Sequence, residues 1–329
     1  MTIENIKKKY FKKLDSMDLD LLIAHVIKKE REFILAHPEY ILNKNQELRI
    51  KNYVQRRLKN EPVAYILGEK EFYGLNFKVN RHTLIPRPET ELMVELAMQK
   101  VISHQSSVIN VVDIGTGSGN IVVSLAHSME QEKFPISNLQ SPNKSQKQNL
   151  KQKNKENELL SVNCGLETVN YFAIDISKEA LKIAKQNAKL NKVSKNIKFL
   201  RGNLLDPFLN NLQATSYKLQ TTSLLILANL PYLSKEIYNA CALNVKKYEP
   251  KTALYSANQG LSHYEKLFSQ IKNIPKATNY KLQATVLIEI SPEQKKLILP
   301  VIKKYFPKAK IEFKKDLAQK WRVCKVNIH

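Results

Sequence analysis

The sequence has 329 residues, enough for one large domain or two ordinary ones, and its 43% hydrophobic content is typical of a globular protein. It contains no run of about 18 apolar residues, so no transmembrane helix is predicted, and residues 1–14 lack the apolar core of a secretory signal. The three cysteines, Cys164, Cys241 and Cys324, form no CxxC pair. This spacing indicates neither a disulfide framework nor a metal site, and we expect a cytoplasmic protein without membrane association.

The net charge of +23 is large and has two interpretations. Contact with RNA, the ribosome or another acidic partner would use such a charge. A compositional bias toward Lys, Asn and Ile, with solvated lysine faces, would also produce it. Because the lysines are spread along the chain, the charge alone does not decide between the two.

Residues 1–68 are predicted to form a small helical domain. Asp18 and Asp20 precede apolar residues at helical spacing and are expected to cap a helix, and another helix is predicted over Gln46–Lys59. The segment contains no catalytic constellation. We interpret it as a docking domain for a macromolecular substrate, because a small substrate would not need one. The alternative is a cap on the larger domain.

Residues 69–88 are predicted to link this domain to the rest of the chain. Glu71–Val79 alternates between polar and apolar residues around a glycine, which favours a β-hairpin. Pro86 and Pro88 then bracket Arg87 and restrict its backbone. Such rigidity suits either a binding site or a stiff interdomain link, and the sequence leaves both open.

A glycine-rich turn follows the apolar strand predicted at Val108–Ile114, which contains Asp113, and precedes a helix. Such a turn lets a ligand approach the backbone closely. Asn120 occupies the place where a dinucleotide fingerprint needs a small residue. The G-x-G-x-G spacing after an acid instead suits S-adenosyl-L-methionine, whose charged aminocarboxylate would lie against the turn. The cofactor-binding residues predicted here are Gly115, Thr116, Gly117, Ser118 and Gly119.

Asp175, at the end of the strand predicted at Tyr171–Asp175, is a further candidate cofactor-binding residue. A carboxylate there can accept both ribose hydroxyls of an adenosyl cofactor. The alternative role, capping the next helix, can be filled by Ser177. Asp175 lies 60 residues after Gly115 (175 − 115), whereas about 20 are expected. Residues 131–168 account for the excess; they are rich in Lys, Asn, Gln and Ser and are predicted to be a disordered insertion dispensable for chemistry.

Two residues after a third predicted strand, Asn196–Leu200, are candidates to flank the adenine: Asn203 and Leu204. Later strands are predicted at Leu224–Ala228, Val286–Ile290, Ile311–Phe313 and Val323–Ile328, with helices between several of them. This alternation predicts an α/β fold with a largely parallel sheet.

The tetrapeptide Asn229-Leu230-Pro231-Tyr232 directly follows the strand predicted at Leu224–Ala228, where open α/β sheets bind their ligands. It suits methyl transfer to a planar, weakly basic nitrogen, whose lone pair is delocalised. The side-chain oxygen of Asn229 can accept one N–H of that nitrogen and the Leu230 carbonyl the other, while Tyr232 packs on its flat face. The same tetrapeptide is also a good turn, so taken alone it leaves a purely structural role open.

Together these motifs resemble the HemK/PrmC family, the glutamine methyltransferases of peptide chain release factors. The resemblance covers nearly the whole chain outside the insertion, and its most specific part is Ile85–Glu91. The other segments that carry it are Glu61–Gly68, Phe72–Gly74, Asp113–Gly119, Asp175, Asn229–Tyr232, Glu249-Pro250, Ala253-Leu254, Gly260-Leu261, Glu289-Ile290, Gln294, Lys315–Leu317 and Arg322-Val323.

The resemblance implies a seven-stranded, Rossmann-like class I S-adenosyl-L-methionine-dependent methyltransferase sheet in residues 89–329, with its last strand antiparallel, behind a five-helix domain and a hairpin linker. It implies methylation of the glutamine in the Gly-Gly-Gln segment of class I release factors, by direct displacement and without a metal. Release factors would be the partners, and direct nucleic-acid binding would not be required. Asn229 and Tyr232 would be catalytic, the whole tetrapeptide would bind the substrate, and Asn229 would also contact the cofactor.

Two positions depart from the family pattern. Leu230 stands where a proline is usual, which makes the backbone less rigid, and Asn203-Leu204 stands where an acid and a large aromatic residue are common. Arg87 and Thr90 are candidates to help hold the cofactor aminocarboxylate.

Two other functions are considered. The first is methylation of an adenine exocyclic amine in RNA or DNA, which the tetrapeptide and the charge would suit but the helical domain and Ile85–Glu91 argue against. The second is a binding protein without activity that has kept the fold. The intact glycine turn and Asn229 argue against it.

Overall fold

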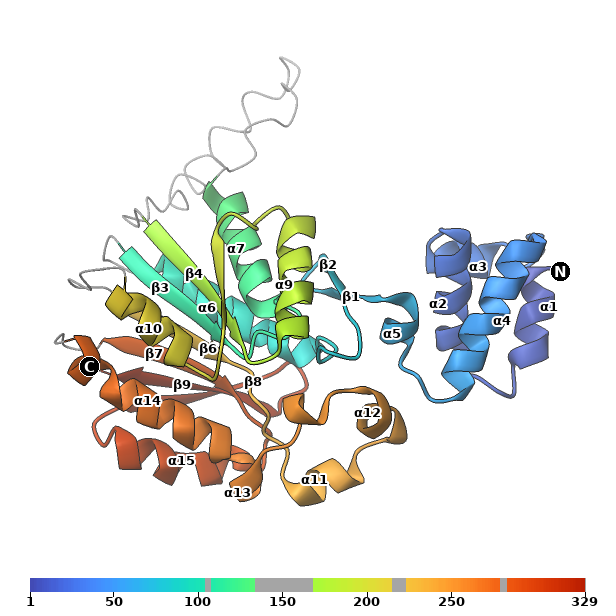
Figure 1. The fold of residues 1–329 in the computed structure, drawn as a ribbon. Coiled ribbons are helices and arrows are strands. Elements are labelled where there is room, and N and C mark those ends of the chain that lie inside the picture. Colours follow the sequence, from blue (N-terminus) through green and yellow to red (C-terminus); the bar gives the residue numbers. More distant parts are fainter. Residues whose placement is uncertain (104–107, 134–167, 215–222, 279–282, 329) are drawn as a thin grey trace, which may run out of the picture.

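The computed structural model describes residues 1–103, 108–133, 168–214, 223–278 and 283–328. A bundle of amino-terminal helices lies apart from a larger α/β body, and a short helix and a hairpin connect the two (Figure 1). The amino-terminal helices are α1 (Ile3–Tyr10), α2 (Ser16–Ile27), α3 (Arg31–Ala36), α4 (Lys44–Leu58) and α5 (Val63–Leu67). Apolar side chains such as Ile3, Leu22 and Ile50 give the bundle a hydrophobic core of its own.

The helix α2 begins earlier than the sequence indicated. Asp15 caps it, because its side chain accepts hydrogen bonds from the backbone N–H groups of Met17 and Asp18. The expectation that Asp18 and Asp20 cap this helix was therefore wrong, since both lie inside it.

The hairpin consists of β1 (Glu69–Phe72) and β2 (Leu75–Lys78), which pair in antiparallel register. Its second strand is fixed to the larger body by Asn187, a fully buried residue of α9 (Lys178–Leu190). The Asn187 side chain accepts from the Lys78 N–H at 2.7 Å and donates to the Lys78 carbonyl at 3.0 Å. The link that follows the hairpin therefore starts from an anchored position beside the sheet.

The larger body contains a seven-stranded sheet in the order β5-β4-β3-β6-β7-β9-β8. The pairs β3–β4, β4–β5, β3–β6 and β6–β7 are parallel, and β9 is antiparallel to both of its neighbours. This confirms the expected sheet with its last strand antiparallel. The strands are β3 (Val108–Ile114), β4 (Thr168–Asp175), β5 (Ile197–Arg201), β6 (Ser223–Ala228), β7 (Ala284–Glu289), β8 (Lys310–Lys315) and β9 (Trp321–Ile328).

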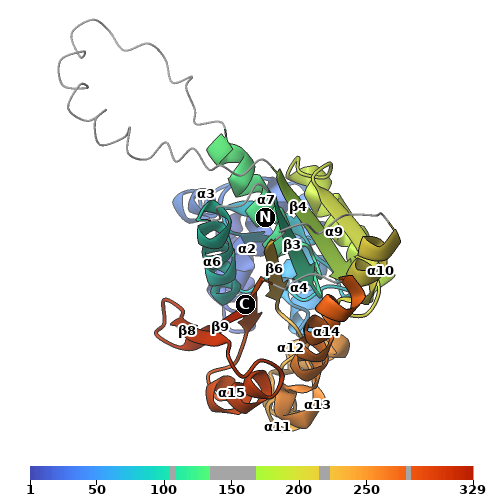
Figure 2. The same cartoon turned by 90° about the vertical axis from the view of Figure 1, so that its left-hand side faces the viewer.

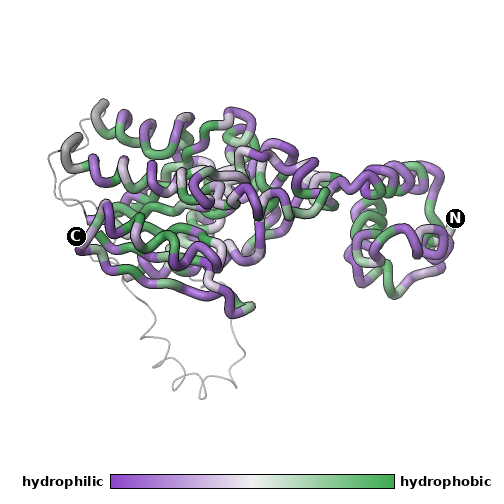
Figure 3. Tube along the Cα trace, turned by 90° about the horizontal axis from the view of Figure 1, so that it is seen from below, coloured by the Kyte–Doolittle hydropathy of each residue, from purple (hydrophilic) through white to green (hydrophobic). Residues whose placement is uncertain are grey.

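Helices cover both faces of this sheet (Figures 1 and 2). One face packs against α6 (Glu91–Ile102), α7 (Asn120–Lys133) and α9, and the other against α10 (Asp206–Ala214), α14 (Ser262–Thr278) and α15 (Gln294–Tyr305). Successive strand residues point to opposite faces, so Leu225 joins the first core and its neighbour Ile226 the second. Figure 3 shows hydrophobic stretches running through the interior of this body.

Shorter elements surround the carboxyl edge of the sheet. The turn η1 (Pro88–Thr90) leads into α6, and the segment between β6 and α14 contains α11 (Lys235–Ala240), α12 (Leu243–Tyr248), η3 (Lys251–Ala253) and α13 (Ala257–Gly260). Of the predicted insertion, residues 131–133 are the end of α7 and residue 168 begins β4. Residues 134–167 lie outside the described part of the chain.

Candidate active site

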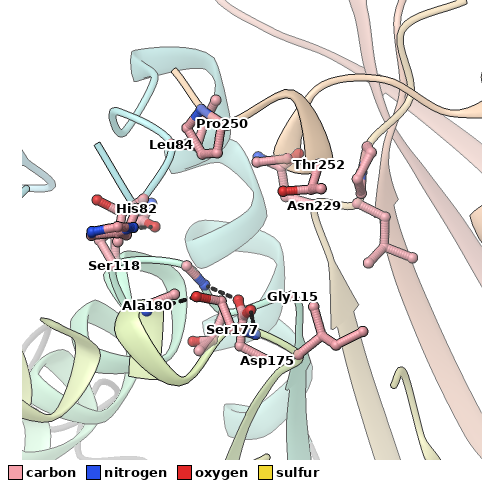
Figure 4. Close-up of a pocket in the computed structure, with 18 of the residues that line it drawn as sticks. His82, Leu84, Gly115, Ser118, Asp175, Ser177, Ala180, Asn229, Pro250 and Thr252 are labelled. Carbon is pink, nitrogen blue, oxygen red and sulfur yellow. Dashed lines mark hydrogen bonds between the residues drawn. The ribbon is translucent and has the colours of Figure 1, made fainter. Parts of the chain in front are cut away.

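The predicted site residues follow four adjacent strands at one edge of the sheet. The glycine turn follows β3, Asp175 ends β4, Asn203 and Leu204 follow β5, and Asn229 follows β6. Strand register brings them together, since Ile114 pairs with both Ile174 and Ala228. They surround a cavity of about 430 Å³ (Figure 4). The predicted residues that line it are Gly115, Thr116, Gly117, Ser118, Asp175, Asn203, Leu204, Asn229, Leu230 and Pro231.

The glycine turn has a left-handed backbone at Gly115 (φ +71°) and Gly117 (φ +55°), which side chains other than glycine rarely adopt. A Cβ on Gly115 would also come within 3.1 Å of the Leu230 side chain. Gly119 is different, because it does not line the cavity and a Cβ there would come within 3.2 Å of the Ala184 Cβ of α9. Because these glycines have no side chain, a ligand in the cavity can contact the backbone of the turn. On the other side of the turn, the helix α9 can pack closely.

Asp175 holds the turn in place and faces the cavity (Figure 4). Its Oδ2 accepts the Gly117 N–H at 2.9 Å, and its Oδ1 accepts the Ser177 N–H at 2.8 Å. Burial raises the pKa of this carboxyl, and the backbone N–H groups oppose that rise. The side chain of Ser177 caps α9, so Asp175 is not needed as the cap. Each carboxylate oxygen keeps capacity for a second hydrogen bond.

The lining residues fit S-adenosyl-L-methionine. The bare turn at Gly115 and Gly117 accommodates a group pressed against the backbone, and Asp175 offers acceptors suited to a ribose diol. Leu204, whose φ is +51°, lines the cavity beside Asn203, and the predicted contact of both residues with the adenine stays a prediction. Asp113 lies behind the turn, where burial raises its pKa to about 7 and a hydrogen bond from the Thr116 hydroxyl opposes that rise.

The tetrapeptide is held from behind by residues of other elements. Asn229 Nδ2 donates to Thr90 Oγ1 at 3.3 Å. Leu230 is 3% exposed and lies in the same hydrophobic core as the fully buried Tyr264. Tyr232 is not among the cavity-lining residues; its hydroxyl donates to Glu289 Oε1 at 3.2 Å. The predicted stacking of Tyr232 on a substrate stays a prediction.

Arg87 and Thr90, which the sequence named as candidates, line the cavity. Two segments that the sequence did not assign to it also line it: residues 82–86 of the linker, and residues 250–253 with Tyr255. Buried Glu249 joins them, because it accepts from Arg87 at 2.6 Å and from the Ile85 N–H at 3.3 Å. The Arg87 guanidinium is thus paired with Glu249 at one nitrogen, and its predicted contact with the cofactor aminocarboxylate stays a prediction. In the sequence, the place of Arg87 between two prolines was the feature that could have indicated a role at the site.

The parallel sheet, the glycine turn and the acceptor aspartate define a class I methyltransferase fold. Comparison of the sequence with known proteins gives the family. The chain is 32% identical to release factor glutamine methyltransferase of Enterococcus faecalis, over 86% of this chain and 82% of that protein. It is 31% identical to release factor glutamine methyltransferase of Bacillus subtilis, over 94% and 90%. The chain therefore belongs to the release factor glutamine methyltransferase family.

Two further comparisons concern parts of the chain and its fold. The family model of the PrmC N-terminal domain matches residues 11–68. Among solved structures, human methyltransferase 10 domain containing protein aligns with a TM-score of 0.45 and 14% identity, over 78% of this chain and 89% of that one. Within the described ranges, none of the helices has the length and apolar character needed to cross a membrane.

Proposed function

We propose that this enzyme transfers the methyl group of S-adenosyl-L-methionine to the side-chain amide nitrogen of the glutamine in the Gly-Gly-Gln segment of class I release factors. The observation that carries the proposal is the position of Asn229 and Leu230, which line the same cavity as the glycine turn and Asp175. The names of the relatives support the substrate. Cys241 and Cys324 are free thiols, which supports a cytoplasmic location.

The tetrapeptide would act by orienting the amide. An amide lone pair is delocalised into the carbonyl, so a strong base would help little. Asn229 Oδ1 would accept one N–H and the Leu230 carbonyl the other, which turns the nitrogen toward the incoming methyl group. The cofactor supplies an electrophilic methyl group on its sulfonium. The nitrogen–carbon bond forms as the sulfur–carbon bond breaks, and the nitrogen then loses one proton to water. Positioning and oriented dipoles would supply the rate.

An assay with purified enzyme, methyl-labelled S-adenosyl-L-methionine and a class I release factor tests this function. We expect label on the release factor, and mass spectrometry should place it on the glutamine. The matched control is a release factor with alanine in place of that glutamine, which should stay unlabelled. Label on ribosomal RNA and none on the release factor would contradict the proposal and favour the adenine methyltransferase alternative.

Residues 1–68 would dock the release factor, residues 69–88 would link them, and residues 89–329 would carry the chemistry. The separate core of the helical bundle supports this division, as do its exposed apolar side chains, among them Phe11 at 73% and Met17 at 53%. Apolar residues on a polar surface are typical of protein interfaces.

Docking predicts that a peptide containing only the Gly-Gly-Gln segment is a poorer substrate than the whole release factor. We expect a higher KM for the peptide and a similar kcat, because docking contacts add binding energy away from the reacting atoms. The measurement is steady-state methylation of both substrates by the same enzyme. Equal KM values would show that residues 1–68 do not dock the substrate.

A further inference from the structure

Glu289 ends β7 behind the tetrapeptide, and its carboxylate joins two parts of the candidate site. The residue is 2% exposed and does not line the cavity. Its Oε2 accepts from Thr90 Oγ1 at 2.7 Å, and its Oε1 accepts from the Tyr232 hydroxyl at 3.2 Å. Thr90, 1% exposed, ends η1. A buried carboxylate therefore ties the end of η1 to the segment proposed to bind the substrate.

The hydrogen bonds through Thr90 have a fixed direction. An ionised carboxylate only accepts, so the single hydroxyl proton of Thr90 is given to Glu289. The Thr90 oxygen can then only accept from Asn229, and Nδ2 is the only donor of that side chain. The opposite amide orientation would place Asn229 Oδ1 against an oxygen without a free proton. The chain of contacts therefore leaves Oδ1 as the Asn229 atom available to a ligand in the cavity.

A cation lies near this carboxylate and favours its ionised form. Arg322 of β9 is 12% exposed and attracts Glu289 electrostatically. Asp316 orients the guanidinium, because Arg322 donates to it from Nε and from an Nη, each at 3.1 Å. Thr90 and Tyr232 add two donors. Glu289 thus has the partners that a buried carboxylate needs.

We propose that Glu289 and Thr90 are positioning residues for methyl transfer, which fix the Asn229 amide so that Oδ1 accepts an N–H of the substrate. This inference rests on the proposed function. Thr90 lines the cavity beside Asn229, and Glu289 does not. The effect proposed for both residues passes through Asn229, so it belongs in kcat rather than in cofactor binding.

The same chain of contacts makes the orientation pH-dependent. A protonated Glu289 can donate to Thr90, and the Thr90 proton can then turn toward Asn229, so the direction of the chain is lost. Burial raises the pKa of Glu289, Thr90, Arg322 and Tyr232 oppose that rise, and Glu89 of η1 adds to it. The remaining group packed here, Tyr264 of α14, donates to the Glu289 backbone carbonyl. Activity should therefore fall as the pH drops through a pKa above the ordinary glutamate value of 4.5.

Single-turnover methylation of a release factor by matched variants tests the proposal. We expect Thr90→Val to lower the rate on the order of 10- to 100-fold, as loss of one oriented polar contact does, with little change in S-adenosyl-L-methionine affinity measured by calorimetry. Thr90→Ser should restore most of the rate, because it keeps the hydroxyl. Thr285→Val is the control. Thr285 is a buried threonine of the same strand as Glu289, 4% exposed, whose hydroxyl bonds Asn327 at 3.0 Å far from the cavity.

Two further readouts separate positioning from a structural role. In an Asn229→Ala background, Thr90→Val should have no additional effect, since its target is gone. Glu289→Gln should lack the acid limb of the pH–rate profile that Glu289 gives the wild type. If calorimetry shows that Thr90→Val is unfolded, the pH–rate profile of Glu289→Gln still tests the inference.

Several results would overturn the inference: equal rates for Thr90→Val and Thr90→Ser, a Thr285→Val loss as large as that of Thr90→Val, additive effects with Asn229→Ala, or an unchanged acid limb in Glu289→Gln. Failure of the proposed function would look different, because the wild type itself would not label the release factor. If the wild type labelled RNA instead, the same variant comparison on RNA would test the positioning.

Discussion

At the second position of the tetrapeptide, Leu230 replaces conformational rigidity with packing. Leu230 lacks the fixed φ of a proline. Its side chain is 3% exposed and packs against the glycine turn at Gly115. Tyr264 of the same hydrophobic core is fully buried and donates to the Glu289 carbonyl. The residue whose carbonyl is proposed to bind the substrate is therefore held by the packing of its side chain.

We predict that Leu230→Pro destabilises the protein, although proline is usual in the family. It removes buried carbon atoms that pack against the glycine turn, and we expect a loss of about 1–3 kcal/mol in the free energy of unfolding. Urea unfolding measures it. Leu230→Met is the matched control, because it keeps the side-chain volume and should cost less than about 1.5 kcal/mol. A proline variant as stable as the wild type would show that this packing contributes nothing.

At the scale of elements, the loop at α13 closes on the end of the tetrapeptide. Gln294, at the start of α15, donates to the Tyr232 carbonyl at 3.0 Å and to the Gln259 carbonyl at 3.3 Å. Gly260 has φ +85°, and a Cβ there would overlap the Tyr232 carbonyl oxygen and crowd the Gln294 amide. The end of the tetrapeptide is thus fixed in two ways. Gly260 allows the close contact with the Tyr232 carbonyl, and Gln294 bridges the Tyr232 and Gln259 carbonyls.

Gly260→Ala should therefore destabilise the protein and lower methyl transfer together. Its matched control is Gly74→Ala in the hairpin, where φ is +69° but nothing lies within 4 Å of the added carbon. We expect the control to cost about 1–2 kcal/mol from backbone strain alone. Gly260→Ala should cost clearly more, because the carbonyl must also move. Thermal unfolding and a methylation assay of both variants measure the losses of stability and of activity. Equal losses in the two variants would show that the close contact at Gly260 contributes nothing.

At the scale of the whole molecule, the sequence predicted what depends on local pattern. Apolar runs that end in Asp113, Asp175 and Asn229 predicted parallel strands whose carboxyl ends share an edge, and the sheet confirms this arrangement. It did not predict how that edge is held. Thr90 and Glu289 are 199 residues apart, and Arg87 and Glu249 are 162 apart. No helical or strand period connects residues at such distances, so only the folded chain pairs them.

The same limit applies to individual site residues. Gly119 is part of the G-x-G-x-G pattern, but its lack of a side chain allows close helix packing at Ala184. Tyr232 belongs to the tetrapeptide, yet its hydroxyl is directed to Glu289 behind the cavity. Spacing alone does not separate residues that face a ligand from those that support them.

The central claim is that Asn229 orients an amide nitrogen beside the methyl donor. The most direct measurement compares wild type and Asn229→Ala in two assays: calorimetric binding of S-adenosyl-L-methionine, and mass-spectrometric quantification of methylated glutamine in a release factor. We predict that the variant binds the cofactor with affinity close to that of the wild type and transfers methyl at least about 100-fold more slowly. A loss of only a few-fold in transfer, or an equal loss in cofactor binding, would contradict the account.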